Sequence, residues 1–345
     1  MRWRRFRILI RRMLWLLSFP LALLVGKLRS RHQVISSWPA TLPQLGPQVV
    51  LFMHFDGKGN VRPQVLHYLR EFKANGRDIV FITNSGRLRP EAMAALQEIC
   101  RIVLIRKNIG YDFGAWADAL EHLGLPQNNT EEVILANDSV FGPLISLSSV
   151  LRRLNYRHID IWGLTESWQQ CYHLQSFFLA FGAKALRAEG FKAFWQSVRP
   201  VPLKTYIVKR YEIGLTKAMA KAGLHCGALW PYEQLTAMVG KELKEGLEDG
   251  VFEKDQIDPV AKTRTAQLLQ ARKNMAQRVP MNPTSDLWRQ LLQAGFPFIK
   301  RELLRDNPSG VSDISEWAEI VHGALGVDPE PIRQELRLML KGKAP

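Results

Sequence analysis

Short apolar runs alternate with amphipathic stretches along residues 49–137, and this alternation is the main structural signal of the sequence. Continuous β-branched runs predict buried strands, and apolar residues spaced at i, i+4 and i+7 predict helices packed against them. The predicted strands are residues 49–53, 78–82, 102–105 and 133–136. The predicted helices between them contain residues 65–72, 90–99 and 115–120. This order is typical of parallel βαβ units, so we predict an α/β fold with a mostly parallel sheet and flanking helices.

Beyond residue 137 the same pattern continues and then changes. Further strands are predicted at residues 159–163 and 175–181, and further helices at residues 184–197 and 211–223. After residue 255 the chain looks mostly helical, with breaks at prolines. We therefore expect an α/β domain over residues 49–240 and a mainly helical C-terminal extension over residues 241–345.

The first 48 residues differ from the rest of the chain. Nine Lys and Arg residues precede the first acid, Asp56, and residues 13–26 form an uncharged, mostly apolar run. As a helix this run would be about 21 Å long, shorter than the roughly 30 Å hydrocarbon core of a bilayer. We expect residues 1–30 to bind a membrane surface, with a signal peptide, a buried helix or a short signal anchor as alternatives. Residues 31–48, rich in proline, are predicted to be a linker.

Charge and cysteine content narrow the classes of partner. The net charge is +15, but its excess lies mainly at one end beside an apolar run, and no nucleic-acid motif appears, so no nucleic-acid partner is expected. Three cysteines without zinc-ligand spacing or a disulfide framework fit a reducing compartment. We expect a peripheral or monotopic protein on the cytoplasmic face of the inner membrane.

Polar residues follow each of the four predicted strands. They are His54 and Asp56, then Asn84 and Ser85, then Asn108, Gly110 and Asp112, and finally Asn137 and Asp138. In an open parallel sheet the ligand lies beyond the carboxyl ends of the strands, and binding residues concentrate on such loops. These strand exits therefore predict a ligand site, with ordinary polar loops as the alternative.

Five motifs give the sequence a more specific resemblance. They are VVLFMHFD (49–56), NIGYDFGAWADAL (108–120), ILANDSVFGPL (134–144), YEIGLTKAMAKAGL (211–224) and NPTSDLW…GFPFIKRELLRDNP (282–308). In this order they resemble the rhamnan synthesis protein F family of polysaccharide-building glycosyltransferases, over roughly residues 48–320. The resemblance implies a GT-A-like nucleotide-sugar-binding domain. It also implies transfer of a sugar, in several members rhamnose, from a nucleotide-sugar donor to a cell-surface polysaccharide or a lipid-linked glycan acceptor.

The resemblance gives the strand exits roles in donor binding. The expected donor-binding residues are His54, Asp56, Asn84, Ser85, Asn108, Gly110 and Asp112, although Asp112 could also serve only as a helix N-cap. In the GT-A arrangement a metal-binding D-x-D ends the fourth strand, and this sequence has Asn137-Asp138-Ser139 there. Asp138 with Asn137 could hold Mg²⁺ or Mn²⁺, or the segment could be only a turn. Nearby cations such as Arg106, Lys107, Lys209 and Arg210 could neutralise the diphosphate instead.

Sugar transfer also needs a base for the acceptor hydroxyl. In inverting GT-A enzymes, which this sequence resembles, the base opens a helix late in the domain, and Glu212 fits that place. The alternative for Glu212 is an acid favoured by the helix dipole, and Glu166 and Asp160 are the other acids considered. An aromatic platform for the acceptor, or simply core, is predicted from Trp162, Trp168, Tyr172 and His173.

Two other functions remain open. A haloacid-dehalogenase-like phosphatase would need an aspartate at the position of His54, and without it no aspartyl-phosphate forms. A non-catalytic, membrane-bound scaffold of a glycan assembly complex would keep the fold without turnover, and the weakened Asn137-Asp138-Ser139 motif favours it.

Overall fold

The computed structural model describes residues 20, 24, 26, 32–248 and 259–340. The predictions for residues 1–30 therefore fall almost entirely outside the described residues. Among the helices described, none is long and apolar enough to cross a membrane. The chain divides into two compact units that interleave along the sequence. Unit 1 comprises Met1–Val61, Arg77–Ala136 and Phe181–Leu224, and unit 2 comprises Arg62–Gly76, Asn137–Ala180 and His225–Pro345.

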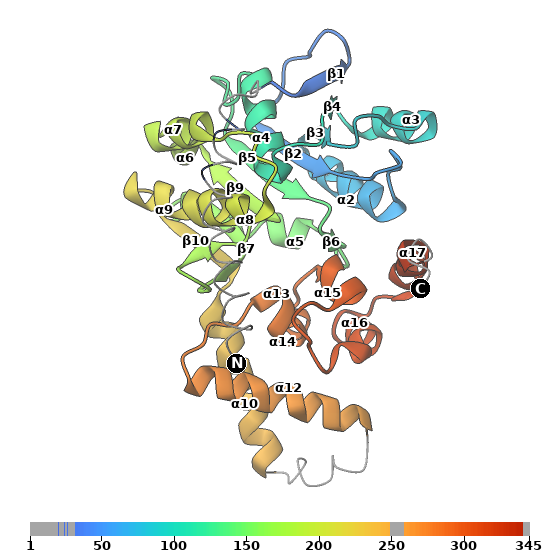
Figure 1. The fold of residues 1–345 in the computed structure, drawn as a ribbon, viewed down its shortest axis with the longest axis vertical. Helices are drawn as coiled ribbons and strands as arrows, with labels where there is room; N and C mark the ends of the chain where they lie inside the picture. Colours follow the sequence, from blue (N-terminus) through green and yellow to red (C-terminus); the bar gives the residue numbers. More distant parts are fainter. Residues whose placement is uncertain (1–19, 21–23, 25, 27–31, 249–258, 341–345) are drawn as a thin grey trace, which may run out of the picture. The chain divides into compact units, whose positions relative to one another are not determined.

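Unit 1 contains the first strands of the predicted sheet, in the order β1-β4-β3-β2-β5 (Figure 1). These strands are β1 (Val34–Trp38), β2 (Gln48–His54), β3 (Asp78–Thr83), β4 (Ile102–Arg106) and β5 (Glu132–Asn137). Strand β3 pairs in parallel with both β2 and β4, whereas β1 pairs antiparallel with β4. The interiors of β2, β3, β4 and β5 are buried because their side chains are apolar on both faces, as expected of a parallel sheet covered by helices.

The helices of unit 1 include the predicted segments 90–99 and 115–120. They are α3 (Pro90–Ile99), α4 (Tyr111–His122), α6 (Ala183–Arg187), α7 (Glu189–Ser197), α8 (Lys204–Ile207), the π-helical turn η1 (Val208–Glu212) and α9 (Ile213–Lys221). Helix α4 packs on the sheet through Trp116, which is fully buried and donates its indole N–H to the carbonyl oxygen of Leu51 at 3.1 Å. Phe113, on the same helix, stacks on Trp195 of α7 with ring centroids 5.9 Å apart. These contacts fix the helix that follows the third predicted strand exit.

Unit 2 holds the remaining strands and most of the helical C-terminal region. Its strands are β6 (Val140–Phe141), β7 (Ile161–Ser167), β8 (His173–Leu174), β10 (Cys226–Trp230) and β11 (Ile299–Lys300). Strand β9 (Phe178–Gly182) has residues in both units, as does β5, whose last residue, Asn137, belongs to unit 2. Strand β7 pairs in parallel with β10 and antiparallel with β8, and β6 pairs antiparallel with β11. The α/β class with a mostly parallel sheet is therefore confirmed.

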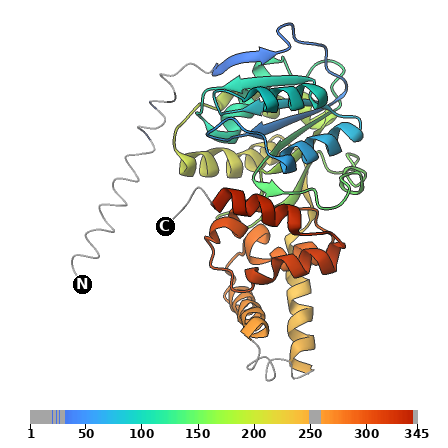
Figure 2. The same ribbon diagram turned by 90° about the vertical axis from the view of Figure 1, so that its right-hand side faces the viewer.

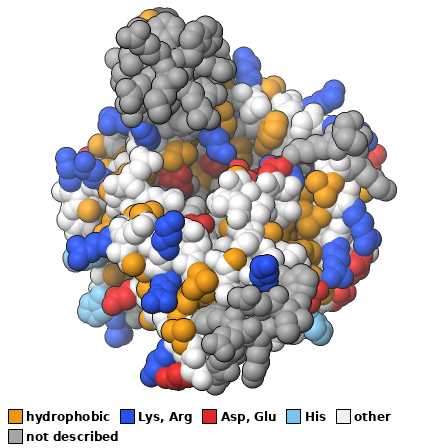
Figure 3. Space-filling view, turned by 60° about the horizontal axis from the view of Figure 1, so that its bottom comes forward, with side chains coloured by type: hydrophobic (Ala, Val, Ile, Leu, Met, Phe, Trp, Pro, Cys, Tyr) orange, Lys and Arg blue, Asp and Glu red, His pale blue; other side chains and the backbone are white. Residues whose placement is uncertain are grey.

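The helices of unit 2 confirm the helical C-terminal extension. They are α2 (Pro63–Ala74), α5 (Ser148–Leu151), α10 (Tyr232–Glu248), α12 (Pro259–Ala276), α13 (Pro283–Asp286), α14 (Trp288–Gln293), α15 (Arg301–Asp306), the 3-10 turn η2 (Ile314–Glu316), α16 (Trp317–Leu325) and α17 (Glu330–Leu340). Helices α10 and α12 pack side by side (Figures 1 and 2), and Nη2 of Arg264 lies 3.8 Å from Oε2 of Glu242. On the face drawn in Figure 3, the visible Lys and Arg side chains are dispersed among hydrophobic and acidic ones.

Several predicted boundaries were wrong. The predicted linker contains β1, whose half-polar sequence carries no strand period and which forms by pairing with β4. The helix predicted at residues 184–197 is broken at Ala188, whose backbone is extended. The helix predicted from residue 211 belongs to a helical run that already begins at Lys204, through α8 and η1. The short strands β6, β8, β10 and β11 were not predicted.

Candidate functional site

The exits of β2 and β3 are joined by a chain of hydrogen bonds. The two strands are paired so that His54 lies opposite Thr83. The Nδ1 atom of His54 is 3.1 Å from the hydroxyl of Thr83, which is 2.7 Å from the hydroxyl of Ser85. That serine oxygen accepts the backbone N–H of Asp56 at 3.0 Å, so the predicted donor-binding residues His54, Asp56 and Ser85 do lie together. His54 is buried, so this network gives its ring a positioning role.

Asp56 also organises its own loop. Its Oδ1 atom accepts the backbone N–H groups of Lys58 at 2.8 Å and Asn60 at 3.1 Å. These bonds form an Asx-type turn in which the carboxylate replaces a backbone acceptor. The loop is therefore rigid, and Asp56 remains half-buried.

A buried ion pair between Arg106 and Asp118 holds Asn84, another of the predicted donor-binding residues. The Arg106 guanidinium, which is 0% exposed, donates to Asp118 Oδ2 from Nη2 at 2.7 Å and from Nε at 2.8 Å. The same guanidinium donates to Asn84 Oδ1, and to the carbonyl oxygen of Gly114 at 3.1 Å. Burial lowers the pKa of Arg106 and raises that of Asp118, and the attraction between the two opposes both shifts. Arg106 is thus a structural cation, and its full burial weighs against the alternative that it neutralises a diphosphate.

The third strand exit leads into α4 through a tight backbone turn. Gly110 has φ +82°, and a Cβ atom there would lie 3.1 Å from the Cα atoms of both Gly114 and Pro200. Tyr111 follows with φ +53° and begins the helix, so Asp112 lies within the first turn. The N-cap position is Gly110, and the N-cap alternative for Asp112 was therefore wrong. Asn108 is exposed before this turn.

The predicted metal residues belong to unit 2. Asn137 Oδ1 accepts from the backbone N–H and the hydroxyl of Ser139, at 3.1 Å and 2.6 Å, as the turn alternative requires. Asp138 Oδ2 accepts from Nη1 of Arg301 at 3.1 Å. Among the described residues, no three or more His, Cys, Asp or Glu side chains lie together in a group that could hold a metal ion. Both predicted ligands already have partners, so they fit a divalent metal poorly.

Glu212 lies at the end of the π-helical turn and immediately before α9, in unit 1. It is half-buried, and the helix-start prediction was wrong because the helical run extends back to Lys204. Sequence periodicity cannot reveal a π-turn, although such turns are frequent at functional sites. The neighbouring Tyr211 anchors the turn, since its hydroxyl oxygen accepts the backbone N–H of Arg199 at 2.8 Å.

The two other acids considered as bases have structural partners. Asp160 is buried and accepts the backbone N–H of His225 at 2.8 Å. Glu166 accepts the backbone N–H of Tyr232 at 3.0 Å. It also hydrogen-bonds the hydroxyl of Tyr172, whose pKa is raised mainly by burial and further by this carboxylate. Both acids therefore help to hold the segment around β10.

The predicted aromatic platform is partly assembled. Trp168 is 49% exposed and its ring centroid lies 5.1 Å from that of Tyr172. His173 is buried, and Trp162 donates its indole N–H to the carbonyl oxygen of Asn155 at 3.1 Å. Trp168 and Tyr172 thus remain the aromatic pair available for stacking.

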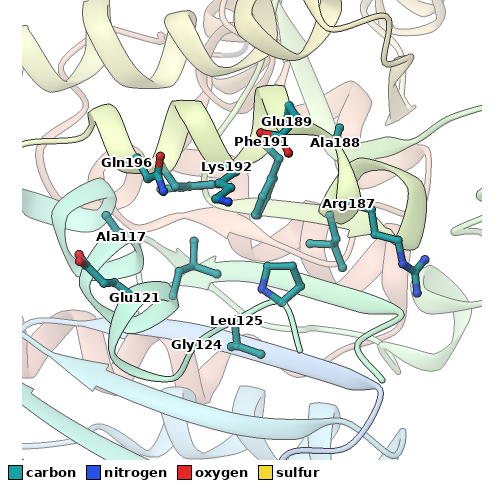
Figure 4. Close-up of a pocket in the computed structure, with 14 residues that line it drawn as sticks. Ala117, Glu121, Gly124, Leu125, Arg187, Ala188, Glu189, Phe191, Lys192 and Gln196 are labelled. Atoms are coloured by element: carbon teal, nitrogen blue, oxygen red, sulfur yellow. The ribbon is translucent and has the colours of Figure 1, made fainter. Parts of the chain in front are cut away.

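A cavity of about 380 Å³ in unit 1 was missed by sequence reasoning. It lies between the C-terminal half of α4, the following turn at residues 124–126, and helices α6 and α7. Figure 4 shows Phe191, Lys192 and Gln196 of α7 on one side of it, and Ala117 and Leu125 on the other. None of the predicted site residues lines this cavity. Its lining comes from separate elements, so no local sequence pattern could have revealed it.

Comparisons with curated proteins identify relatives of similar length. The virulence protein VirA of Vibrio anguillarum is 29% identical over 238 residues, which cover 66% of this chain and 70% of VirA. The uncharacterized protein y4gN of Sinorhizobium fredii is 28% identical over 171 residues, or 48% of this chain and 44% of y4gN.

Solved structures give only distant similarity. A mannosyltransferase from Pyrobaculum calidifontis, solved with GDP-Man and Mn²⁺, aligns with a TM-score of 0.36 at 11% identity, covering 94% of this chain and 87% of that one. A putative nucleotide-diphospho-sugar transferase from Desulfovibrio desulfuricans aligns with a TM-score of 0.33 at 12% identity, covering 54% and 80%. The family comparison is more specific, because the rhamnan synthesis protein F family matches residues 79–249. The predicted resemblance is therefore confirmed, because residues 79–249 of this chain match the rhamnan synthesis protein F family.

Proposed function

We propose that this chain is a glycosyltransferase that moves a sugar from a nucleotide-sugar to a cell-surface polysaccharide or a lipid-linked glycan. Rhamnose is the first sugar to test. The observation that carries the proposal is the family match over residues 79–249, which includes the second to fourth strand exits and Glu212. The grouping of polar residues at the carboxyl ends of β2 and β3 supports it, because this is where parallel sheets bind nucleotides.

In this proposal the exits of β2 and β3 bind the nucleoside part of the donor. The rigid Asp56 loop and the hydroxyl of Ser85 offer hydrogen-bonding groups at the rim of the network, where both residues are half-buried. Asn84 is held in one orientation by Arg106, so its place is fixed before a ligand arrives. Such preorganisation lowers the entropy that binding would otherwise cost.

Glu212 is proposed as the base of an inverting transfer. Its carboxylate would take the proton of the acceptor hydroxyl as that oxygen attacks the anomeric carbon. The bond between this carbon and the diphosphate oxygen breaks at the same time, and the nucleoside diphosphate leaves with the electron pair. Glu166 and Asp160 are less suited to this role, since both hold backbone N–H groups.

The test is a screen of the purified, full-length protein against dTDP-rhamnose, GDP-mannose and UDP-glucose with glycan acceptors. Release of the nucleoside diphosphate, coupled to extension of the acceptor, is the expected result, and linkage analysis would identify inversion. Glu91→Gln provides a matched control for Glu212→Gln, because Glu91 is an exposed acid in the first turn of α3.

The second candidate function is a non-catalytic scaffold of a glycan assembly complex. The engagement of Asn137 and Asp138 by protein partners favours it. Turnover of any nucleotide-sugar by the purified protein would eliminate the scaffold. A folded protein that binds no nucleotide-sugar in titrations with and without Mn²⁺ would favour it.

Membrane attachment through residues 1–30 completes the proposal, with the protein on the cytoplasmic face of the inner membrane. Nine basic residues and an apolar run at one end of the chain support this placement. A chain that begins at residue 31 is expected to leave the membrane fraction and remain folded. Sedimentation with membranes in high salt after this truncation would contradict the attachment.

A further inference from the structure

The motif GFPFIKRELLRDNP contains Arg301, which the proposed function has not used. Strand β11 pairs antiparallel with β6, so that Ile299 lies opposite Phe141 and Lys300 opposite Val140. The backbone N–H of Arg301 then donates to the carbonyl oxygen of Ser139 at 2.9 Å. This pairing holds Arg301 against the Asn137-Asp138-Ser139 turn, so two motifs that are distant in the sequence meet in the fold.

The side chain of Arg301 completes the attachment to this turn. Its Nη1 atom donates to the carbonyl oxygen of Asp138 at 2.6 Å and to the carboxylate Oδ2 of the same residue at 3.1 Å. The guanidinium carbon lies 5.6 Å from the ring centroid of Phe141. The Arg301 side chain is 13% exposed and that of Asp138 is 18% exposed, so the pair is held firmly but still reaches the surface.

This arrangement opposes a divalent cation at Asp138. A metal there would have to share the carboxylate with a guanidinium, and the two positive charges would repel each other at close range. The Oδ1 atom of Asn137 already accepts two hydrogen bonds from Ser139, so it offers little to a metal. The guanidinium of Arg301 therefore occupies the place where the sequence predicted a bound metal ion.

Arg301 and a second arginine, Arg62, both lie close to the carboxylate of Glu335. Glu335 Oε1 lies 3.6 Å from Nη2 of Arg301 and 3.9 Å from Nε of Arg62. Both distances exceed a hydrogen bond, and within the described part of the chain this buried oxygen has no hydrogen-bond partner. Two guanidinium groups thus converge on one carboxylate without hydrogen-bonding it. Guanidinium groups recognise phosphate oxygens by the same paired N–H geometry that they use for carboxylates.

We propose that Arg301, assisted by Arg62, supplies the positive charge for the donor diphosphate, and that donor binding by this chain is therefore independent of a divalent metal. The inference rests on the proposed function and names the groups that bind its substrate. The ligand is a nucleoside diphosphate group, and the same cations would stabilise it as it leaves. The backbone carbonyl oxygen of Asp138 then orients Arg301, whereas its carboxylate competes with the diphosphate for the same guanidinium.

The test is a set of calorimetric titrations on the full chain with dTDP-rhamnose, GDP-mannose, UDP-glucose and inorganic pyrophosphate. Wild type is expected to bind at least one nucleotide-sugar, and pyrophosphate, equally well in EDTA and in Mn²⁺. Arg301→Gln should weaken both about 10- to 100-fold, the usual effect of losing a charge-assisted hydrogen bond. Arg305→Gln, a more exposed arginine on the same helix, is the matched control and should change affinity less than about twofold.

Two further variants separate charge from folding. Arg301→Lys keeps the positive charge and should recover part of the lost affinity, although a lysine cannot reproduce the guanidinium fork. Asp138→Asn removes the anion that competes for Arg301 and should tighten pyrophosphate binding by about threefold or more. A metal site at Asp138 requires the opposite, since Asp138→Asn would then weaken binding. Circular dichroism of each variant verifies the fold.

The outcomes distinguish this inference from the function on which it rests. Binding that appears only with Mn²⁺ and is lost in Asp138→Asn would overturn the inference and leave the glycosyltransferase intact. A folded wild-type chain that binds pyrophosphate but no nucleotide-sugar would overturn the proposed function, and with it the role of Arg301 in donor binding. Metal-independent binding that is lost in Arg301→Gln and restored in part by Arg301→Lys would support both.

Discussion

The buried pair of Arg106 and Asp118 is expected to control both the stability of unit 1 and the orientation of Asn84. Asp118→Asn removes the negative charge but keeps nearly the same shape. Asp118 Oδ2 accepts two N–H groups of Arg106 and, at 3.0 Å, the backbone N–H of Gln33. An amide oxygen can keep some of these hydrogen bonds, but it leaves a fully buried guanidinium charge without a counter-ion.

Breaking one partner of a buried ion pair usually costs about 3–5 kcal/mol. That is a large part of the roughly 5–15 kcal/mol that stabilises a typical domain. The measurement is urea unfolding followed by circular dichroism, with the midpoint of the first transition compared between variants, because a chain of two units need not unfold in one step. Donor affinity should fall as well, since Arg106 no longer fixes Asn84 as firmly.

Glu121→Gln is the matched control for this experiment. Glu121 lies on the same helix, its side chain is 45% exposed, and its Oε1 atom lies 3.9 Å from Nε2 of the exposed His32. Its loss should change stability by less than about 0.5 kcal/mol. Replacing both partners, as in Arg106→Met with Asp118→Leu, should restore part of the lost stability but not donor affinity. A cost below about 1 kcal/mol for Asp118→Asn would refute the reasoning.

Three further predictions follow from single residues. Glu212→Gln should lower turnover about 10²- to 10⁴-fold while donor affinity stays within about twofold, and near-normal turnover in a coupled assay would refute the base assignment. Gly110→Ala should lower the free energy of unfolding by about 1–3 kcal/mol in urea titrations, because its φ of +82° strains an L residue and a Cβ atom would crowd the Cα atoms of Gly114 and Pro200; an unchanged midpoint would contradict this. Burial raises the pKa of Cys226 to about 12, so its reactive thiolate is scarce at pH 8. Mass spectrometry should find exposed Cys171 alkylated first, with the Cys226 rate rising about tenfold per pH unit up to pH 10; equal rates at pH 8 would count against the burial.

The strands and helices between residues 48 and 137 were predictable because their signals are local. Runs such as Val49–Met53 mark a strand that is buried on both faces, whatever its neighbours. Strand β1 was missed because its sequence, VISSW, is half polar and depends on pairing with β4. The helix around Glu212 was misplaced because α8, η1 and α9 join without a cap that sequence could reveal.

The site residues could be named from sequence, but not their partners. Residues at strand exits can be recognised because they interrupt apolar runs, and this is how Asn84 and Asp138 were found. The partner of Asn84 is Arg106, which sequence reasoning placed near a diphosphate. The partner of Asp138 is Arg301, 163 positions away in the chain. Such pairings depend on tertiary packing, which neither periodicity nor composition contains.

Strand β1 has a consequence for how the chain behaves when it is shortened. It pairs with one side of β4, for example Trp38 with Val103, while β3 occupies the other side. A chain that began near residue 40 would leave the amide and carbonyl groups on that side of β4 open to a strand from another molecule. Loss of this five-residue edge strand would then lead to self-association in filaments or domain-swapped dimers. A chain that begins at residue 32 keeps β1 and should not self-associate in this way.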